Sequence, residues 1–135
     1  MAMYLGKDKI SDINNVILPD TYNVKLYLNN ELTSGGVLEG VKSIRLYAYY
    51  NQSKLVSITL PKTLETMGSL AFLGCTSLKI VTCKAKNPPI IQTYANNYFG
   101  ENIEAIYIPK GTIDAYSTAN KWSEYADKFV EKEDL

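Results

Sequence analysis

Apolar residues recur along the middle of the chain with a period close to 23 residues. A step of 23 carries three apolar positions onto three others: Leu55 onto Leu78, Ile58 onto Val81 and Leu60 onto Cys83. A further step of 25 reaches Ile103, Ile106 and Ile108. Each copy begins with the pattern L-x-x-I-x-L. Self-similarity at such a period predicts a repeat architecture in which every copy folds in the same way.

The L-x-x-I-x-L pattern predicts a short strand, because its last two apolar residues are two apart and share one side. Pro19, Pro61 and Pro109 directly follow the last apolar residue of a copy and should end the strand, since proline cannot donate to a ladder. One copy cannot bury its apolar side alone, so the copies are expected to stack into a parallel sheet. The stretch 62–77 suits a short helix or irregular turns better than a second long strand.

The first 36 residues are less regular. Val24, Leu26 and Leu28 alternate with polar or aromatic residues, two asparagines follow, and the chain can return through 31–37, a pattern that allows a hairpin. Gly35-Gly36 falls where the next strand is expected, so this copy looks degenerate. We therefore predict an irregular N-terminal cap over residues 1–36, because a repeat array must shield its open edge.

The segment 110–135 is predicted to cap the other end. Apolar residues between Ile113 and Phe129 recur every three or four positions, which indicates a helix over about 112–130. Asp114 would complement the dipole of its first turn. The helix should cover the last repeat, with a frayed tail after it.

Composition adds limits on function. The 135 residues suffice for one domain, and 46% of them are apolar. Fourteen basic and fourteen acidic side chains cancel, so the chain lacks the cationic excess that nucleic-acid backbones require. No run of about 20 apolar residues predicts membrane insertion, and the first ten residues show no signal peptide.

Candidate chemistry is sparse. Histidine is absent, which removes the usual general base and the commonest metal ligand. Cys75 and Cys83 cannot complete a zinc site, and two reduced, buried thiols are favoured over a disulfide between them. Nucleotide-binding glycine loops are also missing from the sequence. We predict no enzyme, no cofactor and no metal.

The string LVSITLPKTLETMGSLAFLGCTSLKIVT resembles the BspA-type leucine-rich repeats of bacterial surface proteins. The shared features are the 23-residue period, Pro61, Gly68 and the run Ala71-Phe72-x-Gly74-Cys75-x-x-Leu78. The ending around 83–129 is similar to the usual ending of such arrays. The resemblance covers about residues 37–130. Gln52 departs from it, because the repeat usually has cysteine there.

This resemblance implies an α/β repeat solenoid: a short leucine-rich-repeat array over 37–109 with a small parallel sheet, an irregular β-rich part over 1–36, and a capping helix and tail over 110–135. It also implies a secreted or cell-surface protein, and adhesion or host-protein binding in some members.

The exposed strand face is the predicted ligand-binding surface. Tyr107 lies between two inward isoleucines and should point outward, where exposed tyrosine often anchors a partner. The predicted site residues are Ser57, Thr59, Lys79, Thr82, Lys84 and Tyr107. The main hypothesis is a non-enzymatic binding module for a protein or glycan. The alternative is a structural or assembly domain of a larger surface or phage-type particle, forming an oligomer through its N-terminal third.

Overall fold

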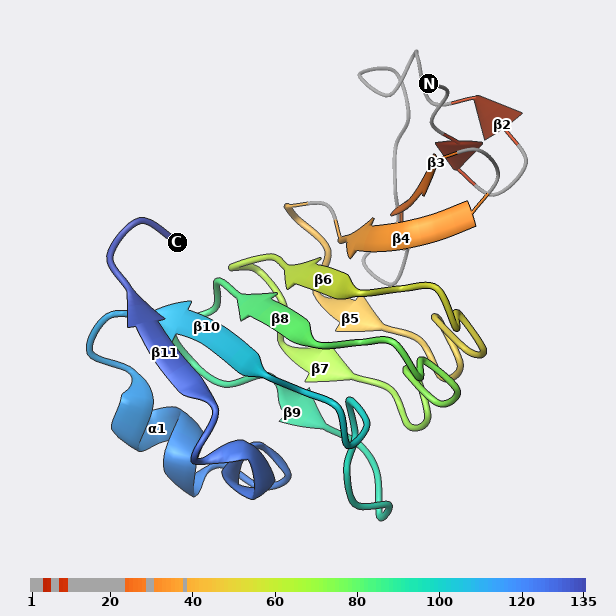
Figure 1. Ribbon diagram of the computed structural model, residues 1–135. Helices are drawn as coiled ribbons and strands as arrows, with labels where there is room; N and C mark the ends of the chain where they lie inside the picture. The colour runs from red at the N-terminus through yellow and green to blue at the C-terminus, as the bar shows by residue number, and fades with distance from the viewer. Residues whose placement is uncertain (1–3, 6–7, 10–23, 29–30, 38) are drawn as a thin grey trace.

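The computed structural model describes residues 4–5, 8–9, 24–28, 31–37 and 39–135 (Figure 1). The strand predicted before Pro19 lies outside these residues. The larger sheet has the order β11-β10-β8-β6-β4-β3-β1-β2, and a smaller sheet behind it has the order β5-β7-β9. The strands of the larger sheet are β1 (Tyr4–Leu5), β2 (Asp8–Lys9), β3 (Val24–Leu28), β4 (Glu31–Gly36), β6 (Ser57–Leu60), β8 (Ile80–Cys83), β10 (Ala105–Pro109) and β11 (Phe129–Lys132).

The register of the larger sheet follows the sequence period. Strands β4, β6, β8 and β10 pair in parallel, and Ile58 lies opposite Val81, which lies opposite Ile106. Residues one repeat apart are therefore direct neighbours across the sheet. The parallel sheet predicted from the repeat is confirmed.

The smaller sheet was not predicted from the sequence. Its strands are β5 (Ser43–Ile44), β7 (Thr66–Met67) and β9 (Ile90–Ile91), paired in parallel. A strand of two residues is too short to show an alternating pattern in the sequence. Each of these strands is stabilised by pairing with the strands of the adjacent repeats. The turns after them are joined in the same way: the amide of Tyr49 donates to the carbonyl oxygen of Ala71 at 2.8 Å.

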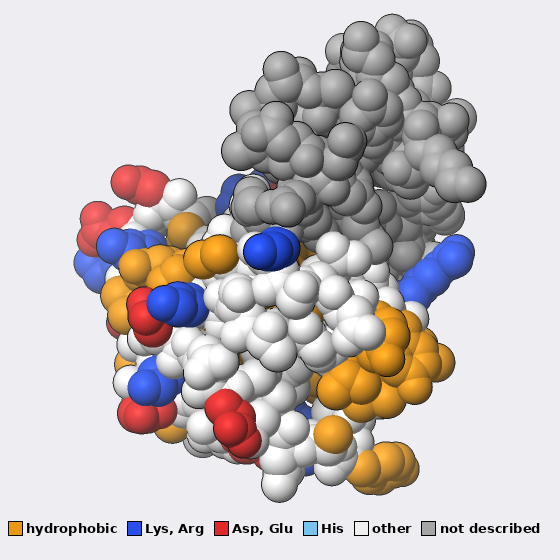
Figure 2. Space-filling view, turned by 45° about the vertical axis from the view of Figure 1, so that its right-hand side comes forward, with side chains coloured by type: hydrophobic (Ala, Val, Ile, Leu, Met, Phe, Trp, Pro, Cys, Tyr) orange, Lys and Arg blue, Asp and Glu red, His pale blue; other side chains and the backbone are white. Residues whose placement is uncertain are grey.

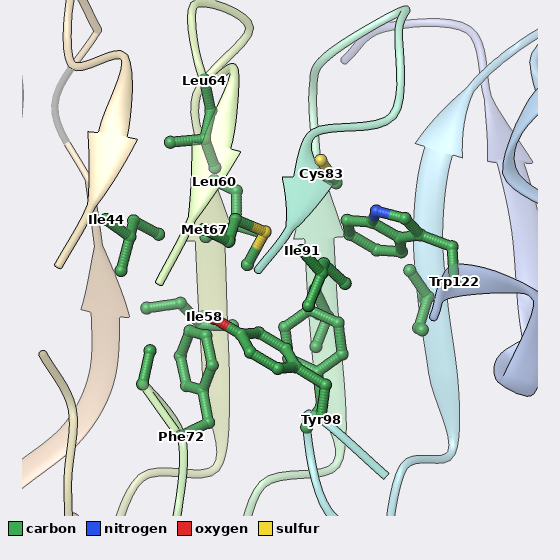
Figure 3. Packing of buried hydrophobic residues seen from close by; sticks show 14 of the residues in the cluster. Ile44, Ile58, Leu60, Leu64, Met67, Phe72, Cys83, Ile91, Tyr98 and Trp122 are labelled. Carbon is green, nitrogen blue, oxygen red and sulfur yellow. The ribbon is translucent and has the colours of Figure 1, made fainter. Parts of the chain in front are cut away.

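The core lies between the two sheets (Figure 3). Ile58 and Leu60 point inward from the larger sheet, and Ile44 and Met67 face them from the smaller one. A row of aromatic rings continues this core through the turns. Tyr49 stacks on Phe72 with ring centroids 5.3 Å apart, and Phe72 contacts Phe99 at 5.2 Å.

The N-terminal part joins the array through β4. Strand β3 pairs with β4 in the antiparallel sense, and Gly35 and Gly36 lie opposite Ile58 and Thr59 of β6. A strand thus occupies the position of the degenerate copy despite its two glycines.

The predicted helix over 112–130 is wrong beyond residue 118. Helix α1 (Ile113–Thr118) is followed by an extended Ala119, and Lys121 has a positive φ of 70° that interrupts the helix before the 3-10 turn η2 (Trp122–Tyr125). The chain then forms β11, parallel to β10, so residues 131 and 132, which were predicted to belong to a frayed tail, lie in a strand. The helical spacing misled the prediction because Tyr116, Trp122, Tyr125 and Phe129 are all buried without sharing one helix.

Gly68 provides a test of the close packing between repeats. An added Cβ at Gly68 would lie 2.5 Å from the backbone nitrogen of Leu46, and backbone cannot rotate away. We expect Gly68→Ala to lower the free energy of unfolding by about 1–3 kcal/mol, measured by urea denaturation with the fluorescence of Trp122.

Gly36→Ala is the matched control, because nothing lies within 4 Å of its added Cβ. It should stay within about 0.5 kcal/mol of the wild type. Equal stability of the two variants would contradict the packing described here.

Candidate functional site

The outward face of the larger sheet carries the residues predicted for binding. Thr59, Thr82 and Tyr107 occupy one row, because Thr59 pairs with Thr82 and Thr82 with Tyr107. All three side chains are half-buried, while the residues between them along each strand point into the core. Gly36 extends the row at one end and Val130 at the other.

A second outward row runs beside the first. Ser57 lies opposite Ile80, and Ile80 lies opposite Ala105. These side chains are small or aliphatic and half-buried. The two rows present hydroxyl groups, methyl groups and one aromatic ring. Such a surface can accept and donate hydrogen bonds and contact apolar groups, but it supplies no acid or base.

Tyr107 contacts a residue that the sequence did not indicate. The Nζ atom of Lys132 lies 4.9 Å from the centroid of the Tyr107 ring, within the range of a cation–π interaction. Both residues line a shallow hollow of about 270 Å³. Lys132 could not be found from the sequence, because it was placed in a tail rather than on a strand beside β10.

The two predicted lysines lie at opposite ends of β8. Lys79 precedes the strand and pairs with Glu104 at 3.6 Å, an exposed ion pair. Lys84 follows the strand and lines a different hollow, which it shares with Lys42 and Lys62. Ser57, Thr59, Thr82 and Tyr107 therefore form one surface, and the lysines flank it.

The thiols are unsuited to covalent chemistry. Neither cysteine forms a disulfide, and both are buried. Burial raises the pKa of the Cys83 thiol to about 11, an effect that hydrogen bonds involving Tyr116 and Ala85 only partly offset. The hydroxyl of Tyr116 donates to the carbonyl oxygen of Ala85 and lies 3.2 Å from the Cys83 sulfur. Cys75 donates to the carbonyl oxygen of Tyr49 at 3.0 Å.

Metal-ligating clusters and membrane-spanning helices are both missing from the part of the chain that the structure describes. Those residues contain no group of three or more His, Cys, Asp or Glu that could hold a metal ion. None of their helices is long and apolar enough to cross a bilayer. Figure 2 shows charges of both signs as separate groups over a largely uncharged surface, with hydrophobic side chains gathered in a few places. The assembly hypothesis depends on residues 1–36, and the structure does not describe most of their side chains.

Parallel strands that recur at steps of 23 and 25 residues, with apolar residues pointing inward, are typical of leucine-rich-repeat proteins. The family model for the BspA type leucine rich repeat region matches residues 22–123 in six copies. The chain belongs to this family, which confirms the resemblance of its repeats. The match begins at residue 22, whereas the sequence pattern placed the start of the first repeat at residue 37. No curated protein gives a match.

The raised pKa of Cys83 predicts an unreactive thiol. At pH 8 a thiol with a pKa of about 11 is ionised to about one part in a thousand, and only the thiolate is nucleophilic. We expect iodoacetamide to label Cys83 in urea but not in the native protein, as followed by peptide mass spectrometry.

Thr76→Cys is the control, because residue 76 is exposed and adjacent to the buried Cys75. This added cysteine should react at once under native conditions. Native labelling of Cys83 at a comparable rate would show an accessible, activated thiol and reopen the question of covalent catalysis.

Proposed function

We propose that this chain is a non-enzymatic binding module that contacts a protein or glycan through the outward face of its larger sheet. The observation that carries this proposal is the row Thr59–Thr82–Tyr107, which crosses three adjacent strands in register. Neighbouring strands lie about 4.8 Å apart, so the row offers evenly spaced side chains, two threonines followed by one tyrosine.

The rigidity of the face supports this role. Each row residue sits between two inward core residues on a strand that is paired on both sides. A surface held in this way loses little conformational entropy on binding, which favours affinity. Tyr107 can supply the aromatic anchor that binding surfaces often use.

We also propose that the stacked copies form a solenoid whose open end is sealed by the segment after Pro109. Trp122 is fully buried, and its indole nitrogen donates to the carbonyl oxygen of Pro89 at 2.8 Å. Its ring contacts Phe99 and Tyr116, with centroids 5.4 and 5.0 Å away. The segment thereby covers aromatic surface that the last repeat would otherwise expose.

Removal of this contact tests the sealing role. Trp122→Ala should lower the free energy of unfolding by about 3–5 kcal/mol, because it opens a cavity and leaves the Pro89 carbonyl without its donor. Urea denaturation followed by far-ultraviolet circular dichroism measures the loss. Tyr94→Ala, at a fully exposed position, should change stability by less than about 0.5 kcal/mol. A loss below 1 kcal/mol for Trp122→Ala would contradict the proposed cap.

The binding proposal is tested with two variants on the face. Tyr107→Ala removes the anchor, and Thr82→Lys places a long cation in the middle of the row. Each should weaken binding to the recognised probe by about tenfold. The probes are an array of defined glycans and a panel of purified extracellular glycoproteins.

The matched controls carry the same changes elsewhere. Tyr94 and Thr76 are exposed and belong to the turns. Tyr94→Ala and Thr76→Lys should therefore leave affinity unchanged. If the face variants bind as the wild type does, or if the controls lose as much affinity, the sheet face is not the binding surface.

A further inference from the structure

Three crossovers of the chain meet at the edge where the strands of the larger sheet end (Figure 1). A hollow of about 650 Å³ lies there, lined by residues of these crossovers together with Pro109 and Leu135. One crossover leads into β5, the next joins β6 to β7, and the third joins β8 to β9. Because the crossovers repeat with the sequence period, similar positions in successive repeats come together here.

The charge of this hollow differs from that of the whole chain. Four lysines line it: Lys42, Lys62, Lys84 and Lys86. Glu65 is the acidic side chain among the lining residues. No ion pair is formed by any of these four lysines with another described residue. An excess of charges of one sign around a hollow raises the local concentration of ligands of the opposite sign.

The backbone beneath the lysines is fixed by contacts between repeats. The amide of Glu65 donates to the carbonyl oxygen of Lys42 at 2.8 Å, and the amide of Ile90 donates to that of Glu65 at 2.8 Å. The hydroxyl of Thr63 donates to the carbonyl oxygen of Val41 at 2.8 Å. Leu64 and Ala85 are buried under the hollow. The lysine side chains thus project from a backbone frame that hydrogen bonds between repeats hold in place.

The types of residue that line the hollow indicate the chemical class of its ligand. The hollow contains no arginine, the residue that favours bidentate recognition of single phosphate or carboxylate groups. Its lysines act instead as adaptable point charges. Its lining also contains no aromatic ring on which a base could stack. Charges spread over three repeats suit a chain of anions better than one small ion.

We propose that this lysine-lined hollow binds a linear anionic glycan, a polymer whose sugars carry sulfate or carboxylate groups. The site is distinct from the Thr59–Thr82–Tyr107 row and does not depend on it. Binding here is electrostatic, so it weakens as salt rises.

The test uses the double variant Lys62→Gln/Lys86→Gln, which leaves Lys84 and the whole sheet face intact. The probes are heparin for sulfate, polygalacturonate for carboxylate, dextran as a neutral glycan and a 20-base-pair DNA duplex. The wild type should bind heparin or polygalacturonate but not dextran. The double variant should bind about fivefold more weakly and show a shallower salt dependence.

The control is Lys54→Gln/Lys128→Gln, which removes the same charge from two lysines outside the hollow, of which Lys128 pairs with Asp127 at 3.8 Å. It should retain affinity within about twofold. The proposal is overturned if the wild type binds neither anionic glycan, if both double variants lose affinity equally, or if DNA binds as tightly and responds to the same variant. Since Tyr107→Ala spares this hollow, failure here leaves the proposed function standing.

Discussion

The structure depends on burial of apolar surface that no repeat can cover alone. Strands β6, β8 and β10 have only four or five residues each, and such a strand has no independent stability. Pairing at the 23- and 25-residue steps brings Ile58, Val81 and Ile106 into one line, and the smaller sheet closes over it. The aromatic row through Tyr49 and Phe72 extends this shared core into the turns.

In this arrangement the outward positions of the strands are less restricted in residue type than the inward positions. The inward positions are restricted to apolar residues of suitable volume, while the outward positions need only tolerate a strand. Two surfaces differ in chemistry as a result. The sheet face offers hydroxyl groups and Tyr107 beside Lys132, and the edge of the crossovers gathers lysines around a hollow. We propose that the first contacts a protein or glycan and that the second binds an anionic polymer.

The C-terminal segment shows how far periodicity can be trusted. The apolar spacing between Ile113 and Phe129 predicted one helix, but the positive φ at Lys121 ends helical continuation and Phe129 pairs with Ile106. Both arrangements bury the same aromatic residues, so a pattern of burial could not distinguish them. The prediction of the site missed Lys132 for the same reason. Lys132 contacts Tyr107 because it lies on β11, and nothing in the local sequence indicated that strand.

The sequence by itself determined the repeat, the inward and outward positions of the strands, the family and the buried state of both cysteines. These follow from patterns within one copy and from their recurrence, which are visible along the chain. Tertiary structure alone decided the second sheet, the last strand and the lysine-lined hollow. Two-residue strands carry no periodic signal, and Lys42, Lys62 and Lys84 become neighbours only when successive crossovers stack at one edge.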